Sequence, residues 1–487
     1  MRRQTSDIES PKPRGGTEDD KYGAKPTGLT GDWPAIMLLL LLYTLQGVPM
    51  GLGASVPMLM VDKGVSTMEQ AVFSMVAYPF AFKLLWAPLV DSVYISSFGR
   101  RKTWIVPAQL AIGGLLLLAS PRVGPLLGDG GAAPDVNTLT ALFFTFYFLA
   151  ATQDIAVDGL ALTILSERNK EYGATCNAIG QTFGYFLSYV GFLGLNTYGL
   201  ASLGGFMFFW GWVFLASTLW VLTVRNDEFA PQPGSKVSQL AAAYKEMATV
   251  LTLGSVRSLA LMLLTVKAPL AAFEALVPLE LQKGGVPKEH LAAITIVMLP
   301  LSMVTQGYVS KHFQAAPADG SGSGSGGGGG GAQPLSIFLK GWKAKLANGV
   351  LCVLLIFGIA AAPRGADGGI PWWLYGLGVL CTVVSSVSGA GMFVAQMAFY
   401  NRVSDPKIGG TYMTMLNTLS NLGGQYPSTL VLTAKGAIEK LGVENGFYGV
   451  SLVSVLFGVA WLALMEKRVL ALQALPREKW LASSAAA

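Results

Sequence analysis

Hydrophobic segments of membrane-spanning length recur along the chain from Ile36 to Leu464, and few of the stretches between them could fold alone. A bilayer core of about 30 Å requires about twenty apolar residues of helix, with every backbone amide bonded inside the segment. The pattern therefore predicts an all-α membrane protein with twelve spans. These cover residues 34–60, 69–97, 103–121, 137–165, 174–198, 204–224, 256–281, 289–312, 337–362, 371–401, 410–434 and 446–466.

Two interruptions divide this series. One is a polar stretch from Arg225 to Lys245, and the other is the run from Gly320 to Gly331, whose composition is typical of a flexible linker. The expected organisation is a disordered cytosolic tail (1–33), an N-terminal six-helix half (34–224), a cytosolic central loop (225–255), a C-terminal six-helix half (256–466) with a disordered glycine-rich loop (313–336), and a cytosolic C-terminal tail (467–487).

Composition and charge agree with a membrane protein. Only 13% of the residues are charged, against about 25% in an ordinary soluble protein. The net charge of +6 does not indicate a nucleic-acid partner, because the basic residues are spread over short loops. Most Lys and Arg residues fall on the side of the two termini, so the positive-inside rule predicts that both termini are cytosolic.

The two halves are related by an internal repeat. A shift of 221 residues brings Val56-Pro57 onto Val277-Pro278, Gly64-Val65 onto Gly285-Val286, and Pro79 onto Pro300. Six spans separate equivalent positions, so the halves have the same orientation and are related by an axis along the membrane normal. This is the arrangement of the major facilitator fold, which we expect here with six helices in each half.

A charged loop lies between the second and third spans. Asp91 ends one predicted helix and Gly99-Arg100-Arg101-Lys102 begins the next, which resembles the cytosolic loop signature of major facilitators. The resemblance implies that Asp91, Arg100 and Arg101 make charged contacts that latch one conformation. The alternative is that the basic residues serve only to orient the chain in the membrane.

Longer segments indicate a narrower family. They are LYTLQGVPMGL (42–52), FKLLWAPLVDSVY (82–94), FGRRKTW (98–104), FLAATQDIAVDGLALTIL (148–165), GVPKEHLA (285–292) and SDPKIGGTYMTMLNTLSNLGGQYPST (404–429). Together they resemble the acetyl-coenzyme A transporters of the endoplasmic reticulum membrane. The resemblance implies a multi-pass protein that carries acetyl-CoA from cytosol to lumen for acetylation there. A more distant similarity to bacterial muropeptide permeases gives the alternative, a proton-coupled permease for muropeptide-like or other anionic solutes.

Two carboxylates lie inside the fourth span. Asp154 and Asp158 are four residues apart, so they project from the same face of the helix. Ionisable residues inside a membrane usually face the bundle interior and mark ion or substrate routes. We expect them to act in proton coupling or gating, with packing against neighbouring helices as the alternative.

Two lysines lie near the middle of predicted spans, Lys83 in the second and Lys267 in the seventh. Acetyl-CoA carries a diphosphate and a 3′-phosphate, so a cavity that accepts it needs cations as counter-charge. We expect Lys83 and Lys267 to attract these phosphates. The alternative pairs Lys267 with Glu274 two turns later or with an Asp of another span, and Glu274 is in either case a candidate for coupling or gating.

Amide side chains complete the predicted cavity. Asn417 and Asn421 are four residues apart in the eleventh span, where Gly423-Gly424-Gln425-Tyr426-Pro427 suggests a break, with the helix unwound where a substrate passes. We expect Asn417, Asn421, Gln425 and, in the first span, Gln46 to bind substrate. The alternative is that these amides tie helices together.

An enzyme is the competing class of protein. The only histidines are His290 and His312, which lie near predicted helix ends, and no metal-ligand cluster, P-loop or dinucleotide fingerprint occurs. The sequence therefore predicts a transporter without catalytic residues, cofactor or metal. Its expected partners are acetyl-CoA and membrane lipid but not nucleic acid, and a homodimer is a possible assembly.

Overall fold

Long helices account for nearly all of the residues that the computed structural model describes, which are 31–166, 169, 172–223, 236–314, 333–363, 370–404, 409–443 and 445–481. No strand occurs among these residues. Most of the expected N-terminal tail, the glycine-rich run and residues 482–487 lie outside them.

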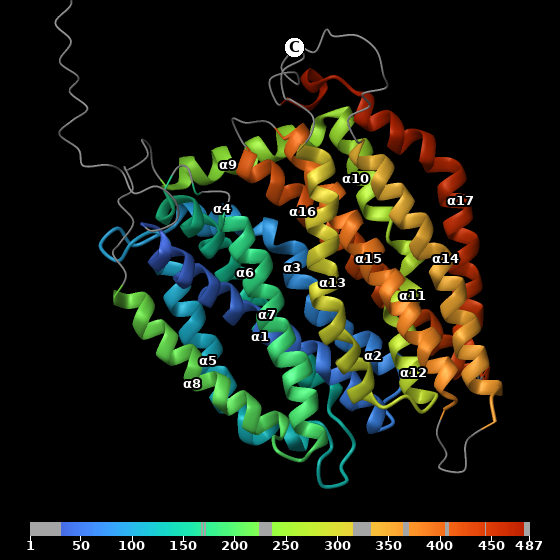
Figure 1. Cartoon of the computed structure of the whole chain (residues 1–487). Coiled ribbons are helices and arrows are strands. Elements are labelled where there is room, and N and C mark those ends of the chain that lie inside the picture. The colour runs from blue at the N-terminus through green and yellow to red at the C-terminus, as the bar shows by residue number, and fades with distance from the viewer. Residues whose placement is uncertain are drawn as a thin grey trace, which may run out of the picture.

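The first six predicted spans form one side of the bundle, drawn in blue to green in Figure 1. Five of them are single helices and the second span is a series of short ones. The elements are α1 (Trp33–Asp62), α2 (Thr67–Phe73), η2 (Ser74–Ala77), α3 (Tyr78–Phe82), η3 (Lys83–Leu85), α4 (Ala87–Ser92), α5 (Lys102–Leu126), α6 (Val136–Ile164), α7 (Tyr172–Thr197) and α8 (Leu203–Thr223).

The last six spans form the other side, drawn in yellow to red (Figure 1), and here the seventh span is the broken one. A further helix, α9, lies in the central loop. The elements are α9 (Lys236–Thr252), α10 (Gly254–Thr265), η5 (Ala268–Leu270), α11 (Ala271–Ala275), α12 (Val277–Lys283), α13 (Lys288–Gln314), α14 (Pro334–Ala361), α15 (Trp372–Val403), α16 (Gly409–Lys440), α17 (Gly446–Ala474) and η7 (Arg477–Trp480).

Each predicted span therefore corresponds to one helix or to one broken series. Within the described residues, nine helical segments are long and apolar enough to cross a membrane. The three spans that fall outside this set are the broken α2–α4 series, α7 and α16. Both α7 and α16 are rich in amide and hydroxyl side chains, which lower their hydropathy. The polar spans are thus the ones that we expect to face the interior of the bundle.

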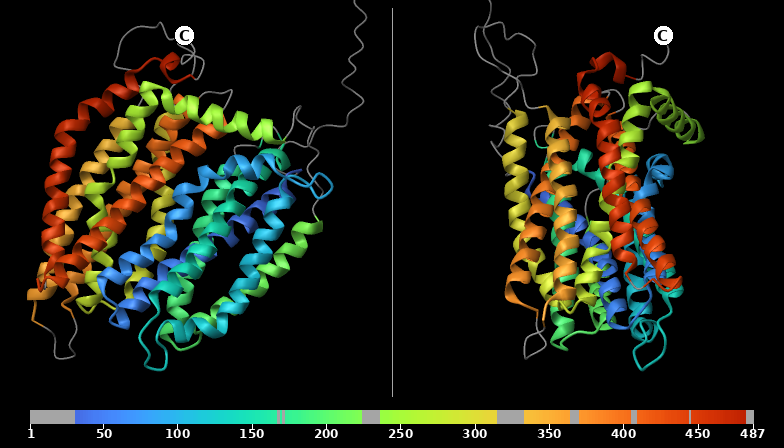
Figure 2. Two further views of the ribbon diagram at one scale, coloured as in Figure 1. Left: turned by 180° about the vertical axis from the view of Figure 1, so that it is seen from behind. Right: turned by 90° about the vertical axis from the view of Figure 1, so that its right-hand side faces the viewer.

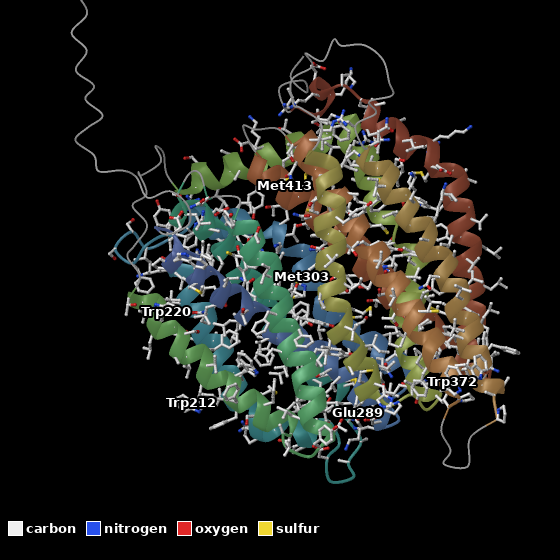
Figure 3. All side chains as sticks on the ribbon, in the orientation of Figure 1. Trp212, Trp220, Glu289, Met303, Trp372 and Met413 are labelled. Atoms are coloured by element: carbon white, nitrogen blue, oxygen red, sulfur yellow. The ribbon has the colours of Figure 1, made fainter. Side chains whose placement is uncertain are left out.

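Large apolar side chains cover the outer face of the bundle. Figure 3 shows Trp212 and Trp220 directed away from α8, and Trp372 at the beginning of α15. Their exposed fractions are 56%, 47% and 84%. Exposure of this kind is costly in water but suits a surface in contact with lipid.

The repeat predicted from the sequence is visible in the backbone of two turns. Gly64 and Gly285 both have positive φ, at 71° and 97°. In each turn the following valine N–H donates to a carbonyl five residues earlier, over 3.0 Å in both cases. Positions related by the 221-residue shift therefore fold alike at the ends of α1 and α12.

Contacts between the two halves close the bundle at the end formed by these two turns, here called the opposite end because it lies away from the C-terminus (Figures 1 and 2). Asp62 at the end of α1 pairs with Lys288 at the start of α13, and it also accepts a hydrogen bond of 2.7 Å from Gln282. Gly436 of α16 packs so closely on α2 that an added Cβ would lie 2.7 Å from the Met68 nitrogen. An ion pair, a hydrogen bond and close backbone packing thus hold the halves together here.

Glycines set the tightest packing within the first half, between α1 and α7. A Cβ added at Gly180 would lie 2.7 Å from the Cβ of Tyr43, and one added at Gly184 would overlap the carbonyl of Thr44. On the other side of this contact, a Cβ at Gly47 would lie 2.5 Å from the Tyr185 nitrogen. Small residues on both helices therefore permit backbone contact, as in other membrane bundles.

Candidate functional site

The second span carries Lys83 to the interior at a helix break. Lys83 is the first residue of η3, and Pro88 is at the N-terminus of α4. Proline has no N–H and its ring crowds the carbonyl four residues earlier, which favours a break in the helix at this point. The break leaves Lys83 next to α6.

Lys83 forms an ion pair with Asp154 of α6, and the two side chains are only 13% and 3% exposed. With its amide nitrogen toward the carboxylate, Gln46 of α1 donates a hydrogen bond of 2.9 Å to the same group. Three of the predicted site residues, from three spans, therefore meet at one point. In this arrangement Asp154 neutralises the charge of Lys83.

Asp158 lies one turn further along the same face of α6, as its spacing predicts. Its carboxylate accepts a hydrogen bond of 2.8 Å from the hydroxyl of Tyr43 in α1 and one of 3.1 Å from the amide of Asn177 in α7. Both carboxylates of α6 are thus bonded to neighbouring helices, as the packing alternative expects. One lysine faces two carboxylates, so the cluster of the first half lacks one positive charge.

Lys267 occupies a second helix break, in the seventh span. It immediately precedes η5, and Pro269 lies within that short helix. Its ammonium nitrogen donates to the Ser420 carbonyl of α16 over 3.4 Å, and it would lie 3.5 Å from a Cβ at Gly424. Both predicted lysines therefore stand where proline interrupts a span, and each approaches a helix that carries predicted site residues.

The alternative pairing of Lys267 with Glu274 does not form among the described residues. Glu274 of α11 forms its ion pair with Lys345 of α14 instead. The 3-10 segment η5 interrupts the α-helix between positions 267 and 274, so two regular α-helical turns no longer separate them. Lys345 was not singled out from the sequence, because it is one of several lysines near the beginning of a predicted span.

The predicted amides of α16 lie along one helix, but the expected unwinding is wrong. The helix runs without a break through Pro427. Its two adjacent glycines instead allow a close approach, since a Cβ at Gly423 would overlap the carbonyl of Leu263 in α10. Asn421 is exposed, and Asn417 and Gln425 are half-buried.

The charged loop residues contact one another within the first half. Asp91 pairs with Arg101 and, at 3.6 Å, with Arg100. The guanidinium group of Arg101 lies against Gly159 of α6, where a side chain at residue 159 would overlap it. The charged contacts implied by the loop signature are therefore present, and a latching role stays a prediction.

Comparison with known proteins identifies the family. A family model described as acetyl-coenzyme A transporter 1 matches residues 35–233, 223–324 and 330–440. The chain belongs to this family. An uncharacterised protein of Schizosaccharomyces pombe is 34% identical to it over 413 residues, covering 82% of this chain and 73% of the relative. An uncharacterised membrane protein of Saccharomyces cerevisiae is 30% identical over 549 residues, covering 92% and 97%.

More distant similarities agree on the fold. The anhydromuropeptide permease of Escherichia coli is 29% identical over 156 residues, covering 32% of this transporter and 30% of the permease. Among solved structures, a bacterial homologue of the lysosomal transporter Spinster in an inward-facing, unoccupied conformation has a TM-score of 0.58 at 14% identity, covering 94% and 98% of the two chains. A D-xylose-proton symporter has a TM-score of 0.59 at 11% identity, covering 88% and 96%. The fold is the major facilitator fold.

The protein is therefore a multi-pass membrane transporter and not an enzyme, because its family and its structural relatives are transporters. Its ionisable groups are distributed unequally between the halves. The first half brings one lysine against two carboxylates, whereas in the second half Lys345 pairs with Glu274 and Lys267 forms no ion pair within the described residues. An anion would accordingly be held more favourably by the second half.

Proposed function

We propose that this transporter carries acetyl-CoA from the cytosol into the lumen of the endoplasmic reticulum by alternating access, supplying acetyl groups for lumenal acetylation. The observation that carries the proposal is Lys267, which forms no ion pair within the described residues although it lies inside a span. An unpaired cation is expensive there unless it faces water or an anionic ligand. The phosphates of acetyl-CoA are ligands of this kind.

Lys83 plays a second part in this proposal. Its partner Asp154 must give up the ion pair if Lys83 is to meet a phosphate, so substrate binding and the charge of Asp154 are linked. Asn417, Asn421 and Gln425 of α16 supply amides for adenine, ribose or pantetheine. Gln46 reaches the same interior from α1.

Alternating access is supported by the distribution of contacts between the halves. Asp62, Lys288 and Gln282 close the opposite end, which becomes the lumenal end if both termini are cytosolic. Substrate would then enter from the cytosol and leave after these contacts have separated. This direction agrees with the delivery of acetyl groups to the lumen.

The proposal is tested by uptake of labelled acetyl-CoA into proteoliposomes that contain the purified full chain. We expect saturable uptake. Unlabelled CoA should inhibit it, and muropeptide should not. Lys267→Ala should reduce uptake much more than it reduces the amount of folded protein. Absence of uptake in both orientations of the protein would refute the proposed substrate.

A second candidate is a proton-coupled permease for muropeptide-like or other anionic solutes. The similarity to the E. coli permease favours it, together with the two carboxylates of α6, which provide groups that could carry a proton. The same proteoliposomes decide between the two. Muropeptide uptake driven by a pH gradient, with no uptake of acetyl-CoA, would establish the permease.

A further inference from the structure

An ion pair lies deep between the helices of the second half. Lys345 of α14 reaches Glu274 of α11, and its ammonium nitrogen would lie 3.6 Å from a Cβ at Gly389, halfway along α15. The Lys345 side chain is 15% exposed and that of Glu274 is 42% exposed. The lysine is therefore enclosed by three spans, and the carboxylate is the more accessible member of the pair.

A neighbouring pair on the same helix shows that this position is unusual. Lys343, two residues earlier, pairs with Glu466 of α17 at 2.6 Å, and these side chains are 45% and 34% exposed. Residues two apart on a helix point about 200° away from each other. Lys343 thus lies on the outer side of α14, and Lys345 points into the bundle.

The inward-pointing pair lies near Lys267. The indole of Trp342, one turn before Lys345 on α14, donates a hydrogen bond of 2.6 Å to the carbonyl of Val266, the residue that precedes Lys267. The two lysines and Glu274 therefore belong to one region of the second half, and this group has a net positive charge when all three are ionised. A phosphate has more charge than a carboxylate and three acceptor oxygens, so it satisfies two ammonium groups better than Glu274 does.

We propose that Lys267 and Lys345 form a two-lysine site for a phosphate group, in which Glu274 is an internal counter-anion that the phosphate replaces. The inference rests on the proposed function, because it assigns the phosphates of a CoA-type substrate to this group. In the empty transporter, Glu274 balances the charge of Lys345 inside the membrane. When a phosphate binds, Glu274 turns away from Lys345.

The local structure permits this exchange. Glu274 belongs to α11, which has only five residues and lies between η5 and α12. Because short helical segments on both sides interrupt the regular hydrogen bonding, a rotation here disturbs less structure than it would in a long helix. Lys345, in contrast, is fixed on the 28-residue helix α14.

The test measures binding of adenosine 3′,5′-bisphosphate and of coenzyme A to the purified full chain in detergent without anionic lipid. Pantetheine, which has no phosphate, is the ligand control, and Lys343→Gln is the matched variant. Lys345→Gln should weaken binding of both phosphate compounds by about tenfold or more, since a hydrogen bond to a charged group is removed. Lys343→Gln should bind as the wild type does, and Glu274→Gln should bind at least as tightly.

Folding defects are separated from binding defects by two further variants. Glu274→Gln/Lys345→Gln removes both charges and so leaves neither member of this pair without its partner, yet it should still bind the bisphosphate weakly. Lys345→Arg keeps the charge and should bind within a few fold of the wild type. Equal binding by Lys345→Gln and Lys343→Gln, or weaker binding by Glu274→Gln, would overturn the inference.

The outcome is distinct from that of the proposed function. If wild-type protein takes up acetyl-CoA but Lys345→Gln and Lys343→Gln behave alike, the function stands and the two-lysine site is wrong. If the bisphosphate binds in a Lys345-dependent manner and acetyl-CoA is not transported, the site stands and the substrate assignment is wrong.

Discussion

Replacing Lys83 and Asp154 singly and together separates the structural role of their ion pair from its role in transport. The single variants are Lys83→Met and Asp154→Asn, and the double variant combines them. Lys83→Met leaves a carboxylate that is 3% exposed without its cation, and Asp154→Asn leaves an ammonium group that is 13% exposed without its anion. The double variant has neither charge, and an Asn at position 154 can still bond to Gln46.

The magnitudes follow from burial. Removing one member of a buried ion pair costs about 3–5 kcal/mol, whereas replacing both members with uncharged groups of similar volume is often neutral. The cost here should lie toward the upper part of this range for Lys83→Met, because Asp154 is the more buried partner. The two losses should not add, since the double variant leaves neither member of the pair without its partner.

The assay combines the thermal midpoint of the detergent-purified protein with uptake per folded molecule in proteoliposomes. Both single variants should melt at lower temperature than the double variant, which should be close to the wild type. Uptake of acetyl-CoA should stay low in the double variant despite its recovered stability. A double variant less stable than either single one would refute the reasoning on stability, and full uptake by it would exclude Lys83 from the site.

Three further results are expected. Gly184→Ala should destabilise the protein by about 1–3 kcal/mol, because the added Cβ would overlap the backbone of α1. Gly191→Ala on the same helix is the control. Its added Cβ would have its nearest neighbour at 3.8 Å, so the thermal midpoint should not change. Gly436→Ala should lower the thermal midpoint, since its Cβ would lie 2.7 Å from the Met68 nitrogen of α2 and would force the halves apart at the opposite end. An unchanged midpoint would show that this backbone contact does not hold the halves together. Tyr244→Phe removes a 2.6 Å hydrogen bond from α9 to the Leu85 carbonyl of η3. It should slow uptake, while the free energy of unfolding falls by only about 1 kcal/mol. An unchanged rate of uptake would show that α9 only connects the two halves.

The long spans could be predicted because hydropathy is summed over about twenty residues, so one atypical residue changes the sum little. The common face of Asp154 and Asp158 could be predicted because helical spacing is local. The partner of Asp154 could not, since Lys83 is 71 residues away along the chain and belongs to a different span. Which side chains pair between two helices depends on how the helices pack, and the local spacing of residues carries no information about that packing.

The breaks in the second and seventh spans also could not be predicted from local sequence. Pro427 lies inside a continuous helix, whereas Pro269 lies at a break, and the residue type is the same. The difference comes from tertiary partners for the backbone carbonyls around the break. The carbonyl of Val266 accepts a hydrogen bond of 2.6 Å from the indole of Trp342, and that of Leu264 accepts one of 2.8 Å from Tyr426. Such partners satisfy the carbonyl groups of an irregular backbone, so a break can be tolerated inside a membrane.

The repeat makes it possible to compare the charged residues at equivalent positions of the two halves. The shift of 221 residues that superposes the turns at Gly64 and Gly285 also brings Gln46 onto Lys267. The two equivalent positions therefore carry different groups, a neutral amide in the first half and an ammonium group in the second. Gln46 bonds to Asp154, while Lys267 donates to the backbone carbonyl of Ser420. The proposed phosphate site at Lys267 and Lys345 accordingly has no counterpart in the first half at Gln46, because an amide there is already bonded to a carboxylate.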